Sequence, residues 1–204
     1  DASFLHGAFD LDAQRAFASR VLATLGFADG AWRLDPTAHP FCTSFSRRDV
    51  RMTTRFESGL DGLWSTMHEA GHGQYAHGIS PTLERTPLAT SPSLGLNESQ
   101  SRTWENLVGR SRPFWLHWYE PLQETFPAQL GEVDLETFLA AVNRAEPGLI
   151  RVEADETTYS LHIILRFELE QELVEGTVAL EDLPEIWNAR MKEFLGVDVP
   201  ERAQ

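Results

Sequence analysis

The fold prediction starts from the stretch Leu60–Tyr75, which has the sequence LDGLWSTMHEAGHGQY. Leu63, Trp64, Met67 and Gly71 fall on one side of this stretch at helical spacing, so it predicts a helix with a buried face. Glycine costs about 1 kcal/mol relative to alanine inside a helix. We therefore expect Gly71 to leave room where the helix approaches another element.

Residues 68–72 within this helix read His-Glu-Ala-Gly-His. His68 and His72 stand four positions apart on the same helical face, so both imidazoles can reach one metal ion. Glu69 projects beside that ion, where its carboxylate can take a proton from an attacking water. The alternative is an ordinary helix whose two histidines bind nothing.

A catalytic zinc site needs a third protein ligand and an open fourth position. Glu98 is a candidate, since it begins a helical pattern in which Glu98, Arg102 and Glu105 share one face. The alternative is an exposed ion pair between Glu98 and Arg102, worth only tenths of a kcal/mol. Asp155 and Glu156 are further candidate acids, and spacing alone does not choose among the three.

The remainder of the chain is mainly helical in pattern. Apolar residues recur at helical spacing in further segments at about 10–26, 96–111, 113–126, 134–145, 156–175 and 183–195. Val50, Met52, Thr54 and Phe56 instead alternate with polar residues, which predicts a half-buried strand with residues 42–45 as its neighbour. The sequence therefore predicts a mainly α fold, with a small antiparallel β-sheet beside the helix that carries the two histidines, in a single domain over residues 1–204.

Composition and charge argue against several classes of partner. The net charge of −14 repels nucleic acid and anionic membranes, so we expect neither as a partner. No apolar stretch approaches the roughly 20 residues of a bilayer span, and the N-terminus lacks a signal-peptide pattern, so we predict a cytoplasmic location. The single cysteine, Cys42, excludes an internal disulfide and a thiolate-rich zinc site.

Five motifs follow one another along the chain. They lie at residues 39–41 (HPF), 49–53 (DVRMT), 68–72 (HEAGH), 97–100 (NESQ) and 150–155 (IRVEAD). In this order they resemble the motifs of the carboxypeptidase Taq family of metallocarboxypeptidases, and the resemblance covers essentially the whole chain. It implies a helical metallopeptidase core with a deep cleft.

The resemblance also implies roles for particular residues. His68, His72 and Glu98 would bind zinc, or another divalent metal such as cobalt, and Glu69 would be the general base. The implied function is a zinc metallocarboxypeptidase that releases single residues from the C-termini of peptide substrates. Members of the family are usually homodimers, so the resemblance implies that state for this chain too.

A carboxypeptidase must recognise the free C-terminal carboxylate of its substrate. An arginine fork suits this task because its two parallel N–H groups match the two carboxylate oxygens. Arg151, inside the IRVEAD motif, is therefore the candidate for substrate binding. The alternative is a structural ion pair between Arg151 and Glu153 or Asp155.

Other polar and aromatic residues have weaker claims on function. Asp49 and Arg51 point to the same side of the predicted strand, where we expect them to organise the edge of the sheet. His77 lies off the face of His68 and His72, so we expect it to be solvated or to lie behind the metal ligands. Four tryptophans are expected to pack between helices: Trp104, Trp115, Trp118 and Trp187.

The chain departs from the family in two respects. The family's histidine before the ligand glutamate is Asn97 here, and family members are much longer than this chain. We therefore expect residues 1–204 to be the catalytic segment of a larger metallocarboxypeptidase. The alternatives are a metal-binding but catalytically impaired fragment that acts as a binding module, and a helical structural domain that binds no metal.

Overall fold

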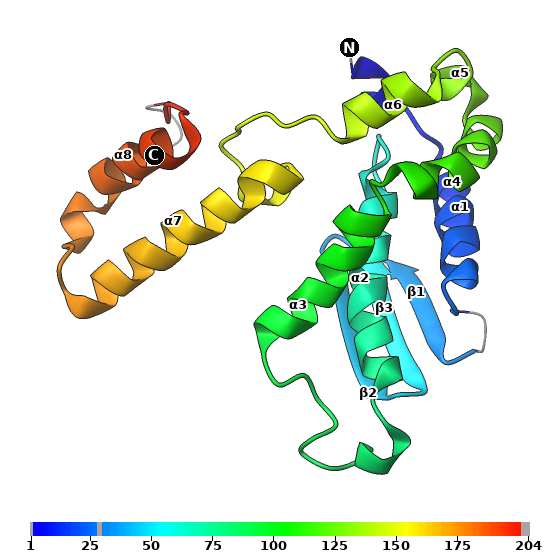
Figure 1. Cartoon of the computed structure of the whole chain (residues 1–204), viewed down its shortest axis with the longest axis horizontal. Coiled ribbons are helices and arrows are strands. Elements are labelled where there is room, and N and C mark those ends of the chain that lie inside the picture. The colour runs from blue at the N-terminus through cyan, green and yellow to red at the C-terminus, as the bar shows by residue number, and fades with distance from the viewer. Residues whose placement is uncertain (1, 28–29, 201–204) are drawn as a thin grey trace. The chain divides into compact units, whose positions relative to one another are not determined.

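Helices dominate the part of the chain that the computed structural model describes, residues 2–27 and 30–200 (Figure 1). The chain divides into two compact units, Asp1–Val142 and Asn143–Gln204, and each has its own hydrophobic core. The mainly α fold predicted from the sequence is confirmed. That the 204 residues act as a single domain stays a prediction.

The small sheet of the first unit is mixed rather than purely antiparallel. It consists of β1 (Trp32–Pro36), β2 (Phe41–Ser46) and β3 (Asp49–Thr54), with β3 in the centre. β2 and β3 form the antiparallel pair that the sequence predicts, whereas β1 runs parallel to β3. The parallel strand brings Trp32 and Leu34 against the buried face of β3, which the alternation along β3 alone does not reveal.

The helix that carries the two histidines, α2 (Asp61–Gly78), packs on this sheet. On its other sides it contacts α1 (Leu11–Thr24) and α3 (Leu94–Arg102). Asp10 is the N-cap of α1, and its side chain accepts a hydrogen bond from the Ala13 amide at 2.9 Å. α2 is thus covered on several faces, which makes it the centre of the first unit.

The first unit contains further helical elements. They are a 3₁₀ turn at Ser3–His6, another at Pro81–Leu83, a π-helix at Thr103–Val108, and the helices α4 (Arg112–Thr125), α5 (Pro127–Leu130) and α6 (Leu135–Val142). Trp115 is fully buried among them, Trp118 is nearly so, and Trp104 packs against the same cluster. These three tryptophans therefore pack between helices, as predicted.

The second unit is built around two helices, α7 (Glu156–Glu175) and α8 (Leu183–Leu195). Both have the bounds that the sequence predicts. Short 3₁₀ turns at Arg151–Glu153 and Leu180–Asp182 precede them. Its core consists of Leu165 on α7 together with Met191 and Leu195 on α8, with Trp187 packed against them.

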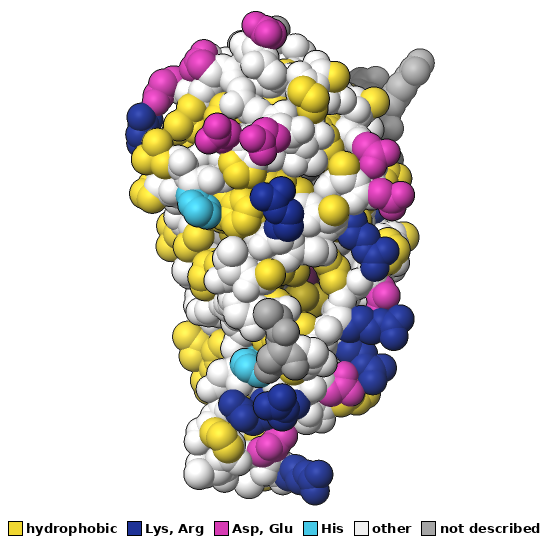
Figure 2. Space-filling model, turned by 90° about the vertical axis from the view of Figure 1, so that its right-hand side faces the viewer, with side chains coloured by type: hydrophobic (Ala, Val, Ile, Leu, Met, Phe, Trp, Pro, Cys, Tyr) yellow, Lys and Arg dark blue, Asp and Glu magenta, His cyan; other side chains and the backbone are white. Residues whose placement is uncertain are grey.

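Acidic and basic side chains gather in different places on one face of the surface. On the face shown in Figure 2, acidic side chains are more frequent in the upper half and basic ones in the lower half. Within residues 2–27 and 30–200, no helix combines the length and the apolar character needed to cross a bilayer.

Candidate metal centre

The candidate metal centre lies where α3 crosses α2. A Cβ atom added to Gly71 would lie 2.5 Å from the Cα atom of Ser101 and 2.7 Å from the carbonyl oxygen of Gln100. The helices can approach this closely only because residue 71 has no side chain. The expected role of Gly71 is thereby confirmed, and this approach carries Glu98 to the face of α2 that presents the histidines.

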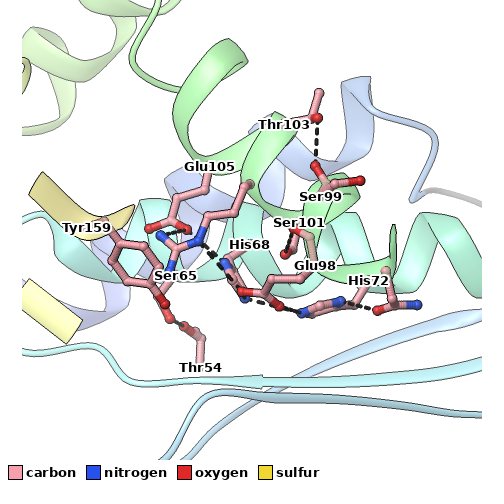
Figure 3. Close-up of polar contacts among 12 residues, drawn as sticks. Thr54, Ser65, His68, His72, Glu98, Ser99, Ser101, Thr103, Glu105 and Tyr159 are labelled. Atoms are coloured by element: carbon pink, nitrogen blue, oxygen red, sulfur yellow. Dashed lines mark hydrogen bonds and ion pairs between the residues drawn. The ribbon is translucent and has the colours of Figure 1, made fainter. Parts of the chain in front are cut away.

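His68, His72 and Glu98 point toward one another between the two helices (Figure 3). The Nε2 atoms of the two imidazoles lie 3.2 Å apart. The Glu98 carboxylate lies 3.2 Å from Nε2 of His72 and 3.6 Å from Nε2 of His68. Candidate ligand atoms from the three residues all fall within 4.8 Å of one another.

These separations fit a small divalent ion. Two ligand atoms bound about 2.0–2.1 Å from a tetrahedral zinc ion lie about 3.3 Å apart, close to the spacing of the two Nε2 atoms. Two imidazoles and one carboxylate are also a ligand set of catalytic zinc sites, which leave a fourth position open. Arg102 lies 3.6 Å from Glu98, so the ion pair weighed as an alternative coexists with the cluster.

Glu69 lies beside this cluster and is almost completely buried, with only 6% of its surface exposed. Burial raises the pKa of Glu69 above its usual value, although the nearby His68 and His72 act in the opposite direction. A carboxylate with a raised pKa is suited to accept and return a proton near neutral pH.

A cavity of about 330 Å³ adjoins Glu69 and His72. Its other lining residues come mainly from β2, which is an edge strand of the sheet, and include Cys42 and Thr43. Burial raises the pKa of the Cys42 thiol to about 12, and the Glu69 carboxylate adds to this rise. The thiol is therefore neutral, and the reactive groups facing the cavity are Glu69 and His72.

The cluster also shifts the acid–base properties of its own members. A hydrogen bond from His72 lowers the pKa of Glu98 to about 2, against the effect of burial, and the charges of His68, His72 and Arg102 contribute. Burial pushes the pKa of His72 down, but its hydrogen bonds to Glu98 and Asn97 raise it overall. The two shifts agree, because each partner stabilises the charged form of the other.

The outer nitrogen of each imidazole has a side-chain partner. Nδ1 of His68 lies 2.7 Å from a carboxylate oxygen of Glu105, and Nδ1 of His72 contacts the amide oxygen of Asn97. Glu105 shares a predicted helical face with Glu98 at a spacing of seven residues, and this pattern is visible in the sequence. That pattern does not show that Glu105 meets His68, because the contact joins separate helices.

Two other residues that the sequence suggested for the site, Asp155 and Arg151, make contacts within the second unit. Asp155 caps α7, since its side chain accepts hydrogen bonds from the amides of Thr157 and Thr158 at 2.8 and 2.9 Å. Arg151, in the second unit, donates a hydrogen bond to the hydroxyl of Tyr159. Within the described part of the chain, no ion pair joins Arg151 to Glu153 or to Asp155.

The positions of His77 and of the Asp49–Arg51 pair differ in part from expectation. His77 is half-buried and its Nδ1 lies 2.6 Å from the carbonyl oxygen of Arg47, so it joins α2 to the turn between β2 and β3. Asp49 and Arg51 form an ion pair at 2.9 Å, as the structural interpretation requires. They lie on the central strand rather than at the edge of the sheet.

Proteins with closely similar sequences are carboxypeptidases. Thermostable carboxypeptidase 1 of Thermus thermophilus is 49% identical over 199 residues, which cover 97% of this chain and 39% of that protein. Carboxypeptidase 1 of Bacillus subtilis is 41% identical, with 97% of this chain and 40% of that protein covered. The chain therefore spans about two fifths of the length of these curated relatives.

Solved structures show the same fold. The M32 carboxypeptidase from Deinococcus radiodurans R1 superimposes with a TM-score of 0.94 and 44% identity, over 98% of this chain and 41% of that chain. A carboxypeptidase from Pyrococcus furiosus superimposes with a TM-score of 0.91 and 39% identity. The family model of the carboxypeptidase Taq (M32) metallopeptidases matches residues 1–204, so the chain belongs to that family.

Proposed function

We propose that this chain carries the zinc-binding and catalytic residues of a metallocarboxypeptidase that releases single residues from peptide C-termini. In this proposal His68, His72 and Glu98 hold the zinc ion and Glu69 is the general base. The observation that supports it best is the convergence of the two Nε2 atoms and the Glu98 carboxylate beside a buried glutamate. Cobalt or another divalent ion would suit the same ligands.

The proposed reaction is hydrolysis of the last peptide bond. A zinc ion bound by the three residues would polarise the scissile carbonyl and acidify a water molecule. Glu69 takes a proton from the attacking water and returns it to the amine of the departing residue. Its raised pKa favours the first transfer, because a carboxylate with a higher pKa is a stronger base toward the attacking water.

The proposed substrate is a peptide with a free C-terminal carboxylate. We assign recognition of this carboxylate to Arg151, whose fork can donate two parallel hydrogen bonds. Tyr159 holds the guanidinium, and the absence of an ion pair to Glu153 or Asp155 in the described chain leaves its charge available for an anion. The cavity beside Glu69 and His72 has room for part of a peptide.

The setting of the reaction is also a proposal. We propose that residues 1–204 act as one catalytic segment of a larger cytoplasmic enzyme that forms a homodimer. The length of the relatives and their names support the first part of this statement. Nucleic acid and membranes are not proposed as partners, because a net charge of −14 disfavours both.

A second candidate is a metal-binding module without turnover. The observation that favours it is Asn97, which keeps a hydrogen bond to His72 but replaces the titratable ring expected from the family resemblance. An amide oxygen is sufficient to orient the ligand imidazole. It offers no proton at neutral pH, so retention of metal and retention of activity are separate questions.

A peptidase assay on the zinc-loaded chain tests the proposal. We expect release of the C-terminal residue from a peptide with a free carboxylate and no release from its C-terminal amide. The Glu69→Gln variant should keep one equivalent of zinc and lose activity by about 10²- to 10⁴-fold. Stoichiometric zinc without hydrolysis by the unmodified chain would favour the binding module, and equal cleavage of the amide would indicate an endopeptidase.

A further inference from the structure

The imidazoles of the two candidate ligands, His68 and His72, contact chemically different groups through Nδ1. Nδ1 of His68 lies 2.7 Å from a Glu105 oxygen, whereas Nδ1 of His72 contacts the Asn97 amide oxygen. Both oxygens can only accept a hydrogen bond, so each Nδ1 must carry the hydrogen. In the neutral form of each ring, Nε2 is then left with a lone pair, directed into the space shared with Glu98. A charged His72 instead donates its Nε2–H to Glu98.

Glu105 comes from an unusual backbone segment. It lies in the π-helix Thr103–Val108, which directly continues α3 beyond Glu98 and Arg102. π-helical turns account for well under 1% of residues in proteins and frequently occur at functional sites. A wider turn at this point changes which side chain faces α2, and here the side chain that meets His68 is Glu105.

The Glu105 carboxylate has a second partner besides His68. Nη1 of Arg102 donates a hydrogen bond to the same Glu105 oxygen at 3.0 Å, and Nε of Arg102 lies 3.6 Å from Glu98. The side chains of Glu105 and His68 are each only 17% exposed. Arg102 therefore links Glu105 to the third candidate ligand and limits the directions that Glu105 can take.

We propose that Glu105 is the positioning residue for His68. It fixes the Nδ1–H tautomer and the plane of the ring, and its negative charge makes Nε2 a stronger donor to a metal ion. Charge-assisted hydrogen bonds are roughly twice as strong as neutral ones, so Glu105 contributes more through His68 than Asn97 does through His72. The proposal rests on the proposed function, in which His68 is a metal ligand.

A purely structural role is the alternative. Glu105 would then serve only as the partner of Arg102, and its loss would weaken the packing of α3 on α2 without a specific effect on His68. The two roles differ in two measurable quantities. They are the affinity for zinc at unchanged stability of the metal-free chain, and the tautomer of the His68 ring.

Zinc titration of the full chain provides the first measurement. We expect Glu105→Gln to weaken zinc binding by about 10- to 100-fold, because the side chain keeps its shape but loses its charge. Asn97→Ala should weaken it less than Glu105→Ala does. Glu124→Gln, an exposed change on α4, is the matched control and should leave the Kd unchanged. Unfolding curves of the metal-free variants establish that each remains folded.

The second measurement needs no metal. Nitrogen-15 spectra of the histidine rings in the zinc-free chain, taken at alkaline pH, report which ring nitrogen carries the hydrogen. We expect His68 to be the Nδ1–H tautomer in the unmodified chain and to shift toward Nε2–H in Glu105→Ala, with no shift in Glu124→Gln.

The two measurements separate failure of this inference from failure of the proposed function. An unmodified chain that takes up no zinc would contradict the proposed function, and the tautomer of His68 would still decide whether Glu105 positions the ring. A Kd and a tautomer that are both indifferent to Glu105 would overturn the inference. They would do so even if the three candidate ligands bind zinc as proposed.

Discussion

The two long helices, α2 and α7, differ in how the chain covers them. α2 has 18 residues, of which nine are buried, and it contacts the sheet, α1 and α3. α7 has 20 residues, of which four are buried, and it leaves Phe167 and Val174 exposed by 58% and 83%. Covering a helix on several sides fixes the directions of its side chains, which a preorganised site requires. The candidate metal ligands lie on, or pack against, the better covered helix.

The largest difference between α2 and α7 is expected in the loss of stability when one side chain of each helix is truncated. Met67→Ala removes a fully buried side chain of α2 and should lower the free energy of unfolding by about 2–5 kcal/mol. Val174→Ala removes an exposed side chain of α7 and should change it by less than about 0.5 kcal/mol. Urea denaturation followed by circular dichroism measures both. Equal effects would contradict the claim that α2 is the better packed helix.

A pair of glycines within α2 sharpens the comparison. The new methyl group in Gly71→Ala would meet the backbone of Ser101, so we expect a loss of about 1–3 kcal/mol together with weaker zinc binding. Gly78→Ala adds the same methyl group in open space at the end of the helix and should leave zinc binding unchanged. Zinc titration with an unfolding curve for each variant is the measurement. Normal affinity in Gly71→Ala would mean that close approach of α3 is not needed.

A smaller effect on the stability of the chain is expected at acidic pH. The pKa of Glu98 is about 2 in the folded chain and near 4.5 for an ordinary glutamate. Its contribution to the stability of the metal-free chain is therefore complete above about pH 4.5 and is lost as the pH falls through about 2. Glu98→Gln should flatten this part of the stability profile, whereas Glu124→Gln should not. Identical acid profiles for Glu98→Gln and the unmodified chain would contradict the assigned shift.

Local patterns were sufficient to predict much of the fold. The bounds of α7 and α8 follow from apolar periodicity, because each pattern lies within one element. Alternation over Val50–Phe56 predicted β3, although the strand ends at Thr54. The parallel pairing of β1 with β3 was missed. Pairing between strands separated by another strand in the sequence leaves no local signal.

In the candidate site too, contacts within one helix could be predicted from the sequence and contacts between helices could not. His68 and His72 could be paired from their spacing alone, because one helical turn fixes both. Glu98 was one of three candidate acids until the approach of α3 at Gly71 brought it to the imidazoles. The contact of Glu105 with His68 depends on a π-helical turn, which no periodic pattern in the sequence marks.

Zinc titration of the unmodified chain beside His72→Ala and Glu98→Ala tests the central claim most directly. The claim is that α2 and α3 together form one three-ligand metal site. We predict one tight equivalent of zinc in the unmodified chain and a loss of that binding in both variants, with each variant folded by circular dichroism. Zinc binding that is absent from the unmodified chain, or that persists without Glu98, would contradict the account.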